Sequence, residues 1–384
     1  MIVKGQTMRL LRALCAIACC SLSLGSHAAE PDLVGGTILL GQSAPFSGPS
    51  SQLATEFNLG ARTYFQGVNE AGGVAGRKIE LRTRDDAYDP ARTAQNTHDL
   101  IEQDGVLALF GYIGTSTTLA ALPVVSAAHV PLFAPSTGAA ALRQPFNRYI
   151  FNIRAGYDQE AQHIVDQLSV TNLTHIAVFH QNDAFGAAGL EAVTRARAKR
   201  NLQLGAVASI ERNSTEVAAA AKALLAAHPD AVVLVSSYTT SAALVKEMRK
   251  DGYKGQFVSL SSVGGKSLAD ELGGAGSGVQ ISEVVPFPWG EANGVQREYA
   301  QAMRKAGVPT RSFGSMEGFI AAKAITEGLR RAGHALTRAK LITALESMHD
   351  WDAGGFHLTF DPDNHNGGHL VEMTMIGADG RFVH

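Results

Sequence analysis

Residues 106–133 read VLALFGYIGTSTTLAALPVVSAAHVPLF and contain one complete β-α-β unit. The apolar run Val106–Phe110 predicts a buried strand, Ser116–Ala128 predicts a helix, and Val130–Phe133 predicts a second strand. Two strands joined through a helix in this way lie parallel, with a right-handed crossover. The unit therefore indicates a parallel sheet covered by helices.

The same alternation extends in both directions and starts again after Phe151-Asn152-Ile153-Arg154. Such a long series, with one restart, predicts an α/β fold of two doubly wound lobes. The expected strands cover residues 37–43, 79–84, 106–110, 130–133, 175–179, 206–210, 231–236, 257–260, 280–285, 356–360 and 371–376. A first helix is expected after a cap at Ser50 or Ser51 and ends at Ala71-Gly72-Gly73. The other expected helices cover residues 90–103, 116–128, 159–168, 187–200, 217–227, 241–250, 294–306 and 316–332.

The composition is that of a folded protein large enough for about two domains. The chain has 384 residues, of which 45% are hydrophobic and 18% charged, so it can bury sizeable cores. Its 33 basic and 35 acidic side chains give a formal charge of −2, so no basic field attracts nucleic acid. Beyond the first thirty or so residues, no apolar run reaches the ~20 residues that span a bilayer.

The first 28 residues have the pattern of a secretory signal peptide. Basic residues precede an apolar run over 14–24, and Ser26-His27-Ala28 forms a cleavage site of small residues. We therefore expect a periplasmic protein whose mature chain lacks cysteine, because all three cysteines lie in this segment. Residues 16–19 faintly resemble a lipoprotein box, so a lipid-anchored form stays open beside the favoured soluble one.

Small polar residues follow three strands of the first lobe, over residues 43–52, 111–118 and 134–138. Ligands of open parallel sheets bind beyond the carboxyl ends of the strands. Thr115 and Ser116 begin a helix, where free backbone N–H groups and the helix dipole suit a carboxylate. For any single loop, ordinary helix capping is the simpler explanation. Three such loops on one sheet favour a ligand cleft.

The second lobe has polar loops over residues 180–186, 237–240 and 261–264. Phe185 and Tyr238 stand in these loops, where core packing does not require aromatic rings. They could stack on an apolar part of a ligand. They could equally well plug the end of the sheet.

The sequence contains no strong enzymatic motif. A nucleophile elbow, a phosphate-binding loop and a strand-linked dinucleotide fingerprint are all missing, so we expect neither an enzyme nor a cofactor. Asp85-Asp86 and Asp89 follow a strand, and we expect them to cap the helix that begins near Pro90. His365 and His369 have the spacing of zinc ligands on a helix, but the residues around them indicate a turn, and we expect no metal there.

Six short motifs, in order along the chain, match those of a known family. They are Ala44-Pro45-Phe46-Ser47-Gly48-Pro49, Gly72-Gly73-Val74-Ala75-Gly76-Arg77-Lys78-Ile79-Glu80-Leu81, Asp85-Asp86-Ala87-Tyr88-Asp89-Pro90, Ala134-Pro135-Ser136-Thr137-Gly138, Asp183-Ala184-Phe185-Gly186 and Glu317-Gly318-Phe319. With them the chain resembles the type I periplasmic solute-binding proteins of ABC importers, in the branched-chain amino-acid (leucine/isoleucine/valine) binding group. The resemblance covers essentially the whole mature chain.

The resemblance implies two lobes joined by three hinge crossings, which close on a ligand between them. Lobe one would comprise residues 29–153 and 286–350, and lobe two residues 154–285 and 351–384. The ligand contacts of the family carry over to Leu53, Thr115, Ser136, Gly138, Phe185, Tyr238 and Ser261, and we add the loop neighbours Ser116 and Thr137. Thr115 and Ser136 would hold a carboxylate, and the two aromatic residues would cover it.

The chain departs from the family at positions that matter for an amino-acid ligand. Amino-acid binders of this group have an acidic residue near Ser261, a threonine hydroxyl where Gly138 stands and a tyrosine where Leu53 stands. An unpaired buried ammonium group would cost several kcal/mol. Either Asp183 or Glu317 therefore supplies the acid, or the ligand is not an α-amino acid.

The leading hypothesis is a monomeric periplasmic receptor without catalytic activity. It would capture a small carboxylate-bearing solute, such as a branched-chain amino acid or a related apolar or aromatic acid or amide. It would then deliver this solute to the permease subunits of an ABC transporter. A ligand sensor that signals to a protein partner, and a secreted metal-dependent hydrolase built on the C-terminal histidines, are the alternatives.

Overall fold

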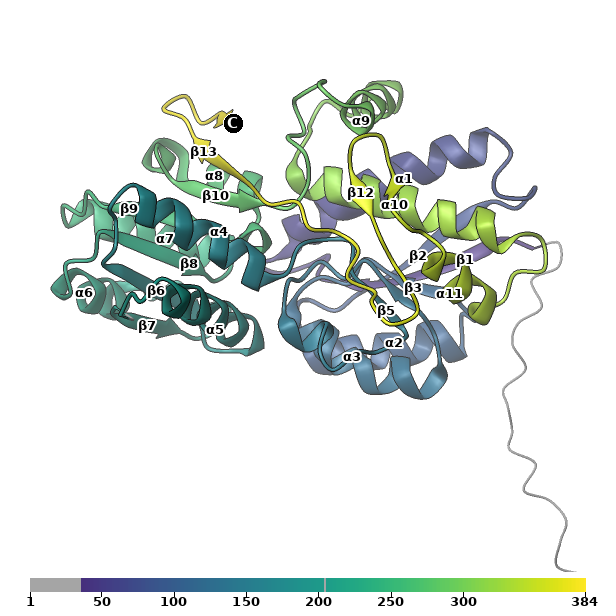
Figure 1. Ribbon diagram of the computed structural model, residues 1–384, viewed down its shortest axis with the longest axis horizontal. Helices are drawn as coiled ribbons and strands as arrows, with labels where there is room; N and C mark the ends of the chain where they lie inside the picture. Colours follow the sequence, from purple (N-terminus) through teal and green to yellow (C-terminus); the bar gives the residue numbers. More distant parts are fainter. Residues whose placement is uncertain (1–35, 204) are drawn as a thin grey trace, which may run out of the picture. The chain divides into compact units, whose positions relative to one another are not determined.

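The computed structural model describes residues 36–203 and 205–384. The predicted signal peptide, residues 1–28, lies outside the described residues. Strands and helices alternate along the chain and form parallel sheets, which confirms the predicted α/β class (Figure 1). Within the described ranges, no helix has both the length and the apolar character needed to cross a bilayer.

Five parallel strands form the first sheet, in the order β2-β1-β3-β4-β5. The central strands are apolar and buried on both faces, as a parallel sheet covered by helices requires. Helices α1 and α10 lie on one side of this sheet and α2 and α3 on the other (Figure 1). The elements are β1 (Ile38–Ala44), α1 (Ser51–Glu70), β2 (Ile79–Asp85), α2 (Pro90–Glu102), β3 (Ala108–Phe110), α3 (Thr115–Ala128), β4 (Leu132–Phe133), β5 (Ile150–Phe151), α9 (Gly294–Lys305), α10 (Phe313–Ala332) and α11 (Arg338–Glu346).

Seven strands form the second sheet, in the order β14-β13-β10-β9-β8-β6-β7. The strands from β10 to β7 in this order are parallel, whereas β13 and β14 pair antiparallel at the other edge. Helix α4 packs against α5, and α7 packs against α6 and α8. The elements are α4 (Tyr157–Val170), β6 (Ile176–Gln181), α5 (Ala184–Lys199), β7 (Val207–Ile210), α6 (Ala218–Ala226), β8 (Ala231–Val235), α7 (Tyr238–Lys250), β9 (Gln256–Ser259), α8 (Gly265–Leu272), β10 (Gln280–Glu283), β13 (Glu372–Ile376) and β14 (Phe382–Val383).

Of the three aspartates expected to cap α2, only Asp89 does so. Asp85, the last residue of β2, instead accepts hydrogen bonds from the backbone N–H groups of Phe46 and Ser47 at 2.9 and 3.1 Å. Asp89 caps α2 by accepting a hydrogen bond from the Arg92 backbone N–H at 2.9 Å, as predicted. Asp86 is fully buried and accepts hydrogen bonds from the hydroxyls of Ser43 and Thr93 at 2.8 and 3.1 Å. Burial raises the pKa of Asp86 to about 6, although these hydrogen bonds oppose the shift.

Two glycines allow α1 and α10 to pack closely. A Cβ atom added at Gly60 of α1 would lie 1.8 Å from the Ser315 carbonyl oxygen of α10. One added at Gly318 of α10 would lie 1.9 Å from the Phe57 carbonyl oxygen of α1. The two backbones are therefore in direct contact, and neither position has room for a side chain. Near the other end of α1, Gly67 is exposed and has nothing within 4 Å of an added Cβ.

Residues 351–366 pack with the first sheet, which differs from the expected lobe boundary at residue 350. The short antiparallel pair of β11 (Trp351–Asp352) and β12 (His357–Leu358) belongs to this segment. Phe356, Leu358 and Phe360 are buried in the core of the first sheet. The Phe360 ring lies edge-on to Phe151 of β5, with 5.4 Å between centroids. These apolar side chains hold the segment on the first core, so the chain crosses to the second sheet after it.

Two crossing segments are joined by backbone hydrogen bonds. The Asn152 N–H donates to the His365 carbonyl, and the Gly367 N–H donates to the Asn152 carbonyl, both at 2.8 Å. The side chains of Asn152 and Asn366 add a hydrogen bond of 3.0 Å. The crossings after β5 and before β13 thus form a short two-stranded ribbon. We refer below to the elements around the first sheet as lobe one and to those around the second sheet as lobe two.

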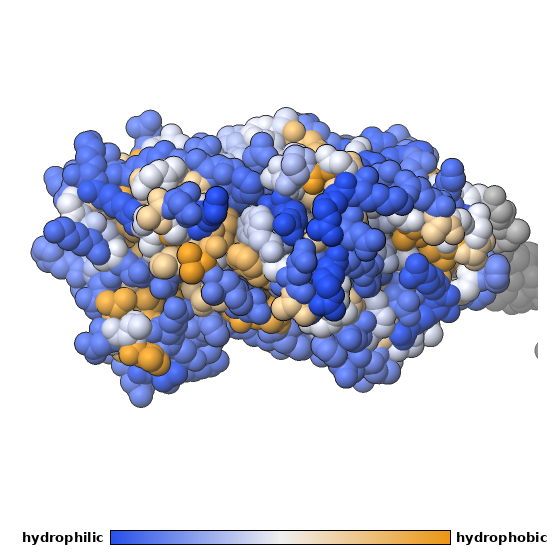
Figure 2. Space-filling view, turned by 90° about the horizontal axis from the view of Figure 1, so that it is seen from above, coloured by the Kyte–Doolittle hydropathy of each residue, from blue (hydrophilic) through white to orange (hydrophobic). Residues whose placement is uncertain are grey.

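The surface in Figure 2 is mostly hydrophilic, and its hydrophobic residues lie in small separate patches. Large apolar side chains exposed among the described residues are Phe146, Val170, Val207, Met375 and Val383. Isolated apolar residues of this kind are ordinary on a surface that faces water.

Candidate functional site

A small cavity lies where the carboxyl ends of β3, β4, β9 and β10 meet the N-terminal parts of α1, α5 and α10. It leaves about 50 Å³ for the centres of water-sized molecules. Since one water needs about 10–15 Å³ on this measure, the space corresponds to three to five waters. The lining residues come from both lobes and are Leu53, Glu56, Phe57, Tyr88, Ile113, Gly114, Ser136, Arg154, Tyr157, Phe185, Ser261, Ser262, Gly264, Gly265, Glu283, Val284, Val285, Phe313, Gly314 and Glu317.

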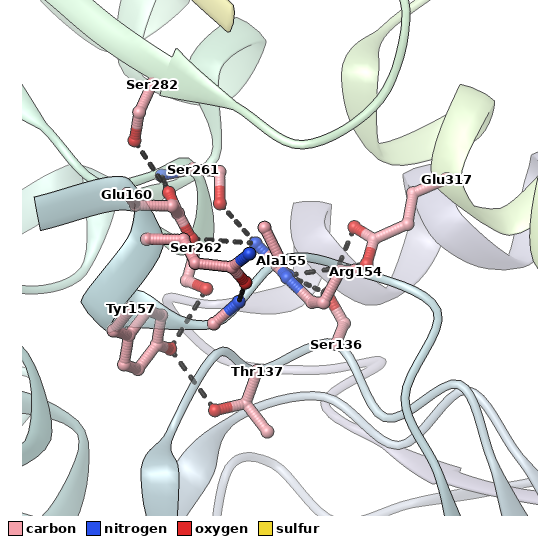
Figure 3. A network of polar contacts seen from close by, with 12 residues as sticks. Ser136, Thr137, Arg154, Ala155, Tyr157, Glu160, Ser261, Ser262, Ser282 and Glu317 are labelled. Atoms are coloured by element: carbon pink, nitrogen blue, oxygen red, sulfur yellow. Dashed lines mark hydrogen bonds and ion pairs between the residues drawn. The ribbon is translucent and has the colours of Figure 1, made fainter. Parts of the chain in front are cut away.

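Arg154 lies at the centre of the polar contacts (Figure 3). It stands on the crossing after β5, and its side chain is only 1% exposed. Its guanidinium donates to the Ser136 hydroxyl of lobe one at 3.0 Å and to the Ser261 hydroxyl of lobe two. The crossing therefore places one cation against both lobes.

Two buried glutamates neutralise Arg154 from opposite sides. Glu317 of α10 lies 3.3 Å from one guanidinium nitrogen, and Glu160 of α4 lies 3.8 Å from another. Burial disfavours the charged guanidinium, but Glu317 and Glu160 outweigh this effect and raise the pKa of Arg154. Burial also raises the pKa of Glu317, which Arg154 and the Ser136 hydroxyl oppose. Glu160 accepts further hydrogen bonds from the Ser261 N–H at 2.9 Å and the Ser282 hydroxyl at 2.6 Å.

Two further glutamates line the cavity. Glu283, the last residue of β10, is 2% exposed, and its Oε1 atom has no hydrogen-bond partner. Burial, followed by the charge of Glu160, raises the pKa of Glu283 well above its usual range, although Arg154 opposes the shift. Glu56 of α1 is half-buried and accepts a hydrogen bond from the Ser267 hydroxyl at 3.1 Å. Burial of its carboxyl group raises the pKa of Glu56, which the hydroxyls of Ser312 and Ser267 oppose.

Glycines next to the carboxyl groups of Glu283 and Glu56 leave room for them, because these positions carry no side chain. A Cβ atom added at Gly265 would lie 2.6 Å from the Glu283 Oε1 atom, and one added at Gly314 would lie 2.8 Å from the Glu56 Oε2 atom. Gly264 has a φ of +91° and faces the Leu53 side chain, which an added Cβ would approach to 2.4 Å. Side chains at these positions would fill the cavity or displace its acidic groups.

The remaining wall is mostly aromatic. Phe57, Phe185, Phe313 and Leu53 contribute apolar surface. The Tyr157 hydroxyl donates to the Ser262 hydroxyl at 2.9 Å and lies 3.2 Å from the Thr137 hydroxyl (Figure 3). Tyr157 therefore joins a loop of lobe one to a loop of lobe two.

The residues selected from the sequence fall into two groups. Those that line the cavity are Leu53, Ser136, Phe185, Ser261 and Glu317. The others, which support its loops without lining it, are Thr115, Ser116, Thr137, Gly138, Asp183 and Tyr238.

Residues of the second group make contacts that explain their position. The hydroxyls of Thr115 and Thr137 share a hydrogen bond of 2.7 Å, so the Thr115 hydroxyl is already engaged within lobe one. The Ser116 hydroxyl donates to the Asp183 carboxylate at 2.9 Å, which connects the two lobes. Asp183 also caps α5 by accepting from the Gly186 N–H at 3.1 Å.

Gly138 and Tyr238 also have structural contacts. The Gly138 carbonyl accepts a hydrogen bond from the Tyr157 N–H at 2.8 Å, and an added Cβ would lie 2.4 Å from the Tyr157 ring. The buried Tyr238 begins α7 and contacts the backbone of Gln52. A side chain at Gly138 would thus displace Tyr157 from the cavity wall.

Sequence reasoning missed several polar residues of the cavity, among them Glu56, Arg154, Tyr157 and Glu283. Glu283 had a detectable signal, because it is the single charged residue within the predicted strand over residues 280–285. Arg154 served only as a marker of the restart between the lobes. Glu56 and Tyr157 lie in the first turns of helices, where polar residues are ordinary, so their sequence context gave no signal.

The histidines near the C-terminus lie in different surroundings. His365 is buried and stacks on Phe151 with 3.8 Å between ring centroids, and it lies 3.6 Å from Glu346. His369 contacts Gln159 on the surface. In the part of the chain that the structure describes, no three histidine, cysteine, aspartate or glutamate residues are arranged to hold a metal ion.

Comparisons with known proteins agree with the two-sheet architecture. A family model described as a periplasmic binding protein matches residues 37–381. The chain is 25% identical to a Leu/Ile/Val-binding protein homolog 7 of Brucella abortus, over 96% of this chain and 95% of that protein. It is also 25% identical to an amino acid binding protein of Pseudomonas aeruginosa, over 62% of this chain and 64% of that protein. The solved structure of a substrate-binding periplasmic protein from Ralstonia solanacearum superposes with a TM-score of 0.85 at 33% identity, over 90% of this chain and 99% of that one.

Proposed function

Because the chain belongs to the periplasmic binding protein family, we propose that it captures a small solute in the central cavity and delivers it to the permease of an ABC importer. The observation that supports capture most directly is the cavity itself. It is enclosed by residues of both lobes and lies beyond the carboxyl ends of parallel strands, where α/β proteins bind ligands. The relatives named above, which are described as binding amino acids, support a solute of similar size.

Two parts of the cavity suit a small solute with a polar end and an apolar end. Gly114 and Ser136 line it beside the N-terminus of α3, where backbone N–H groups favour a carboxylate. Leu53, Phe185 and Phe313 offer apolar surface to the rest of the molecule. This arrangement supports the carboxylate-bearing solute that we expected from the sequence.

Capture and release would require the lobes to move about their crossings. Several hydrogen bonds between the lobes surround the cavity, among them those between Ser116 and Asp183, between Thr137 and Tyr157 and between Ser267 and Glu56. Each joins side chains at the rim of the cavity, so all of them can break together when the lobes separate. A solute that contacts both lobes would favour the joined arrangement by its own binding free energy.

A panel of small solutes tests the proposal. Purified protein would be heated in the presence of branched-chain amino acids, aromatic acids and short amides, and the midpoint of unfolding would be recorded. A bound solute raises the midpoint by mass action, and at one hundred times its Kd it adds about 2.7 kcal/mol of stability. Calorimetry would then measure the affinity of each hit. If no solute of the panel binds, capture by this cavity is wrong.

A further inference from the structure

The ionisable groups around the cavity carry an excess of negative charge. The lining contains three glutamates, Glu56, Glu283 and Glu317, and one arginine, Arg154. Glu160 lies directly behind Arg154 and adds a fourth carboxylate. When all five groups are ionised, a single cation therefore faces four anions in an enclosed space.

Arg154 cannot neutralise Glu283 and Glu56 as well. Its guanidinium is already held by Glu317 and Glu160 and by the hydroxyls of Ser136 and Ser261. Among the described residues, no ion pair connects Glu283 or Glu56 to a basic side chain. The charge of Lys266 acts on Glu56, but the Lys266 ammonium pairs with Asp270 at 2.6 Å.

Glu283 lines the cavity and has an unsatisfied acceptor. Its Oε1 atom is buried beside Gly265, where an added Cβ would lie 2.6 Å away, and it has no hydrogen-bond donor. A buried carboxylate without a partner is costly, so it must bind either a proton or a cation. Glu56 lines the same cavity, and its charge acts on Glu283. The two carboxyl groups together can accept several N–H donors from one group.

We propose that the captured solute carries a cationic nitrogen group, an ammonium, amidinium or guanidinium, which binds against Glu283 and Glu56. This inference rests on the proposed function, because it concerns the same cavity. A cationic N–H donor would supply both the charge and the hydrogen bonds that Glu283 lacks. With a neutral or anionic group in its place, the two carboxyl groups would have to take up protons instead. Neither residue was among the acids expected from the sequence, Asp183 and Glu317.

Three molecules of nearly identical shape test the sign of the charge. Acetamidinium, acetamide and acetate are planar, have four heavy atoms each and differ in charge, and their size suits the small cavity. A larger branched series of 3-methylbutylamine, 3-methylbutanamide and 3-methylbutanoate covers solutes that require more space. Calorimetry would give the affinity of each molecule at constant ionic strength. We expect the cation to bind about tenfold or more tightly than its neutral and anionic partners in the series that binds.

Two matched variants locate the effect. Glu283→Gln keeps the shape of the side chain and removes its charge, and it should reduce the affinity for the cation by about tenfold or more. Glu102→Gln makes the same chemical change on the exposed face of α2 and should leave all affinities unchanged. Glu56→Gln should also reduce the affinity for the cation.

The outcomes separate this inference from the proposed function. If acetamide, acetate or their branched counterparts bind as tightly as the cations, the proposal of a cationic group is wrong, but the proposal that the cavity captures a solute is not contradicted. The same holds if Glu283→Gln keeps the preference for the cation. If none of these molecules binds, and no solute of the panel described above binds, both the inference and the proposed function are wrong.

Discussion

Replacement of Arg154 by methionine should destabilise the protein strongly. Methionine keeps an unbranched chain of similar reach but removes the guanidinium that lies 3.3 Å from Glu317 and 3.8 Å from Glu160. With an effective dielectric constant of about 20, each contact corresponds to about 4–5 kcal/mol of attraction before the cost of desolvation. Loss of one partner from a buried ion pair typically costs about 3–5 kcal/mol, because it leaves uncompensated charge behind.

Protonation of Glu317 limits the loss of stability that Arg154→Met can cause. Burial already raises the pKa of Glu317, so this carboxyl group can take up a proton when the cation is gone. We therefore expect a loss of about 3 kcal/mol at neutral pH and a smaller loss in acid. Urea unfolding would measure it as a lower midpoint at constant slope.

A double-mutant cycle identifies the ion pair as the cause. Glu317→Gln combined with Arg154→Met should be more stable than Arg154→Met alone, with a coupling of about 1–3 kcal/mol. Arg195→Met is the matched control, because Arg195 is 40% exposed and its ion pairs with Asp158 and Glu191 lie on the surface. It should change stability by less than about 1 kcal/mol. A loss below about 1 kcal/mol for Arg154→Met, or the absence of coupling, would refute the reasoning.

Three further changes test other parts of the structure by urea unfolding. Gly60→Ala should destabilise the protein by more than about 1 kcal/mol, because the new Cβ atom would meet the backbone of Ser315. Gly67→Ala in the same helix should instead stabilise the protein by about 0.5–1 kcal/mol. Equal effects of the two substitutions would contradict the close contact of α1 and α10. Burial raises the pKa of Asp86 from 3.8 to about 6, so the stability that its protonation provides is complete below about pH 4 and is lost as the pH rises through about 6. The stability of the wild type relative to Asp86→Asn should therefore fall by about 2.4 kcal/mol between about pH 4 and about pH 7, and a difference that does not vary with pH would disprove this burial effect. Tyr157→Phe should cost about 1 kcal/mol because the hydrogen bond to Ser262 is lost, and Ser262→Ala should add little to it; additive losses would show that the two hydroxyls do not interact.

The order of strands and helices could be predicted because the parallel strands are buried on both faces and read as continuous apolar runs. The predicted helix start at Pro90 is confirmed because its cap, Asp89, is a local signal. The attachment of residues 351–366 to the first core is not local. Phe356 and Phe360 are apolar and would suit either core, and only the contact with Phe151 decides between them.

Local sequence reasoning reached the site through the loops that follow strands, whereas Leu53 and Glu317 were selected from the family resemblance. Ser136 and Ser261 could be selected in this way, and both line the cavity. Glu56 and Glu283 could not be recognised as a pair, because they are separated by more than two hundred residues and come from a helix of one lobe and a strand of the other. The burial of their carboxyl groups depends on how the two lobes meet, and no local sequence pattern encodes that arrangement.

The paired crossings at Asn152 and Asn366 have a mechanical consequence. Two segments joined by backbone hydrogen bonds resist twisting better than two separate segments, but they can still bend perpendicular to the plane of the ribbon. If the lobes separate, this ribbon would favour a hinge bend about the joint over a rotation of one lobe against the other. Repeated swings would bring Arg154, which stands two residues from Asn152, back to the same place, so the charge that organises the cavity need not be repositioned at each visit of a solute.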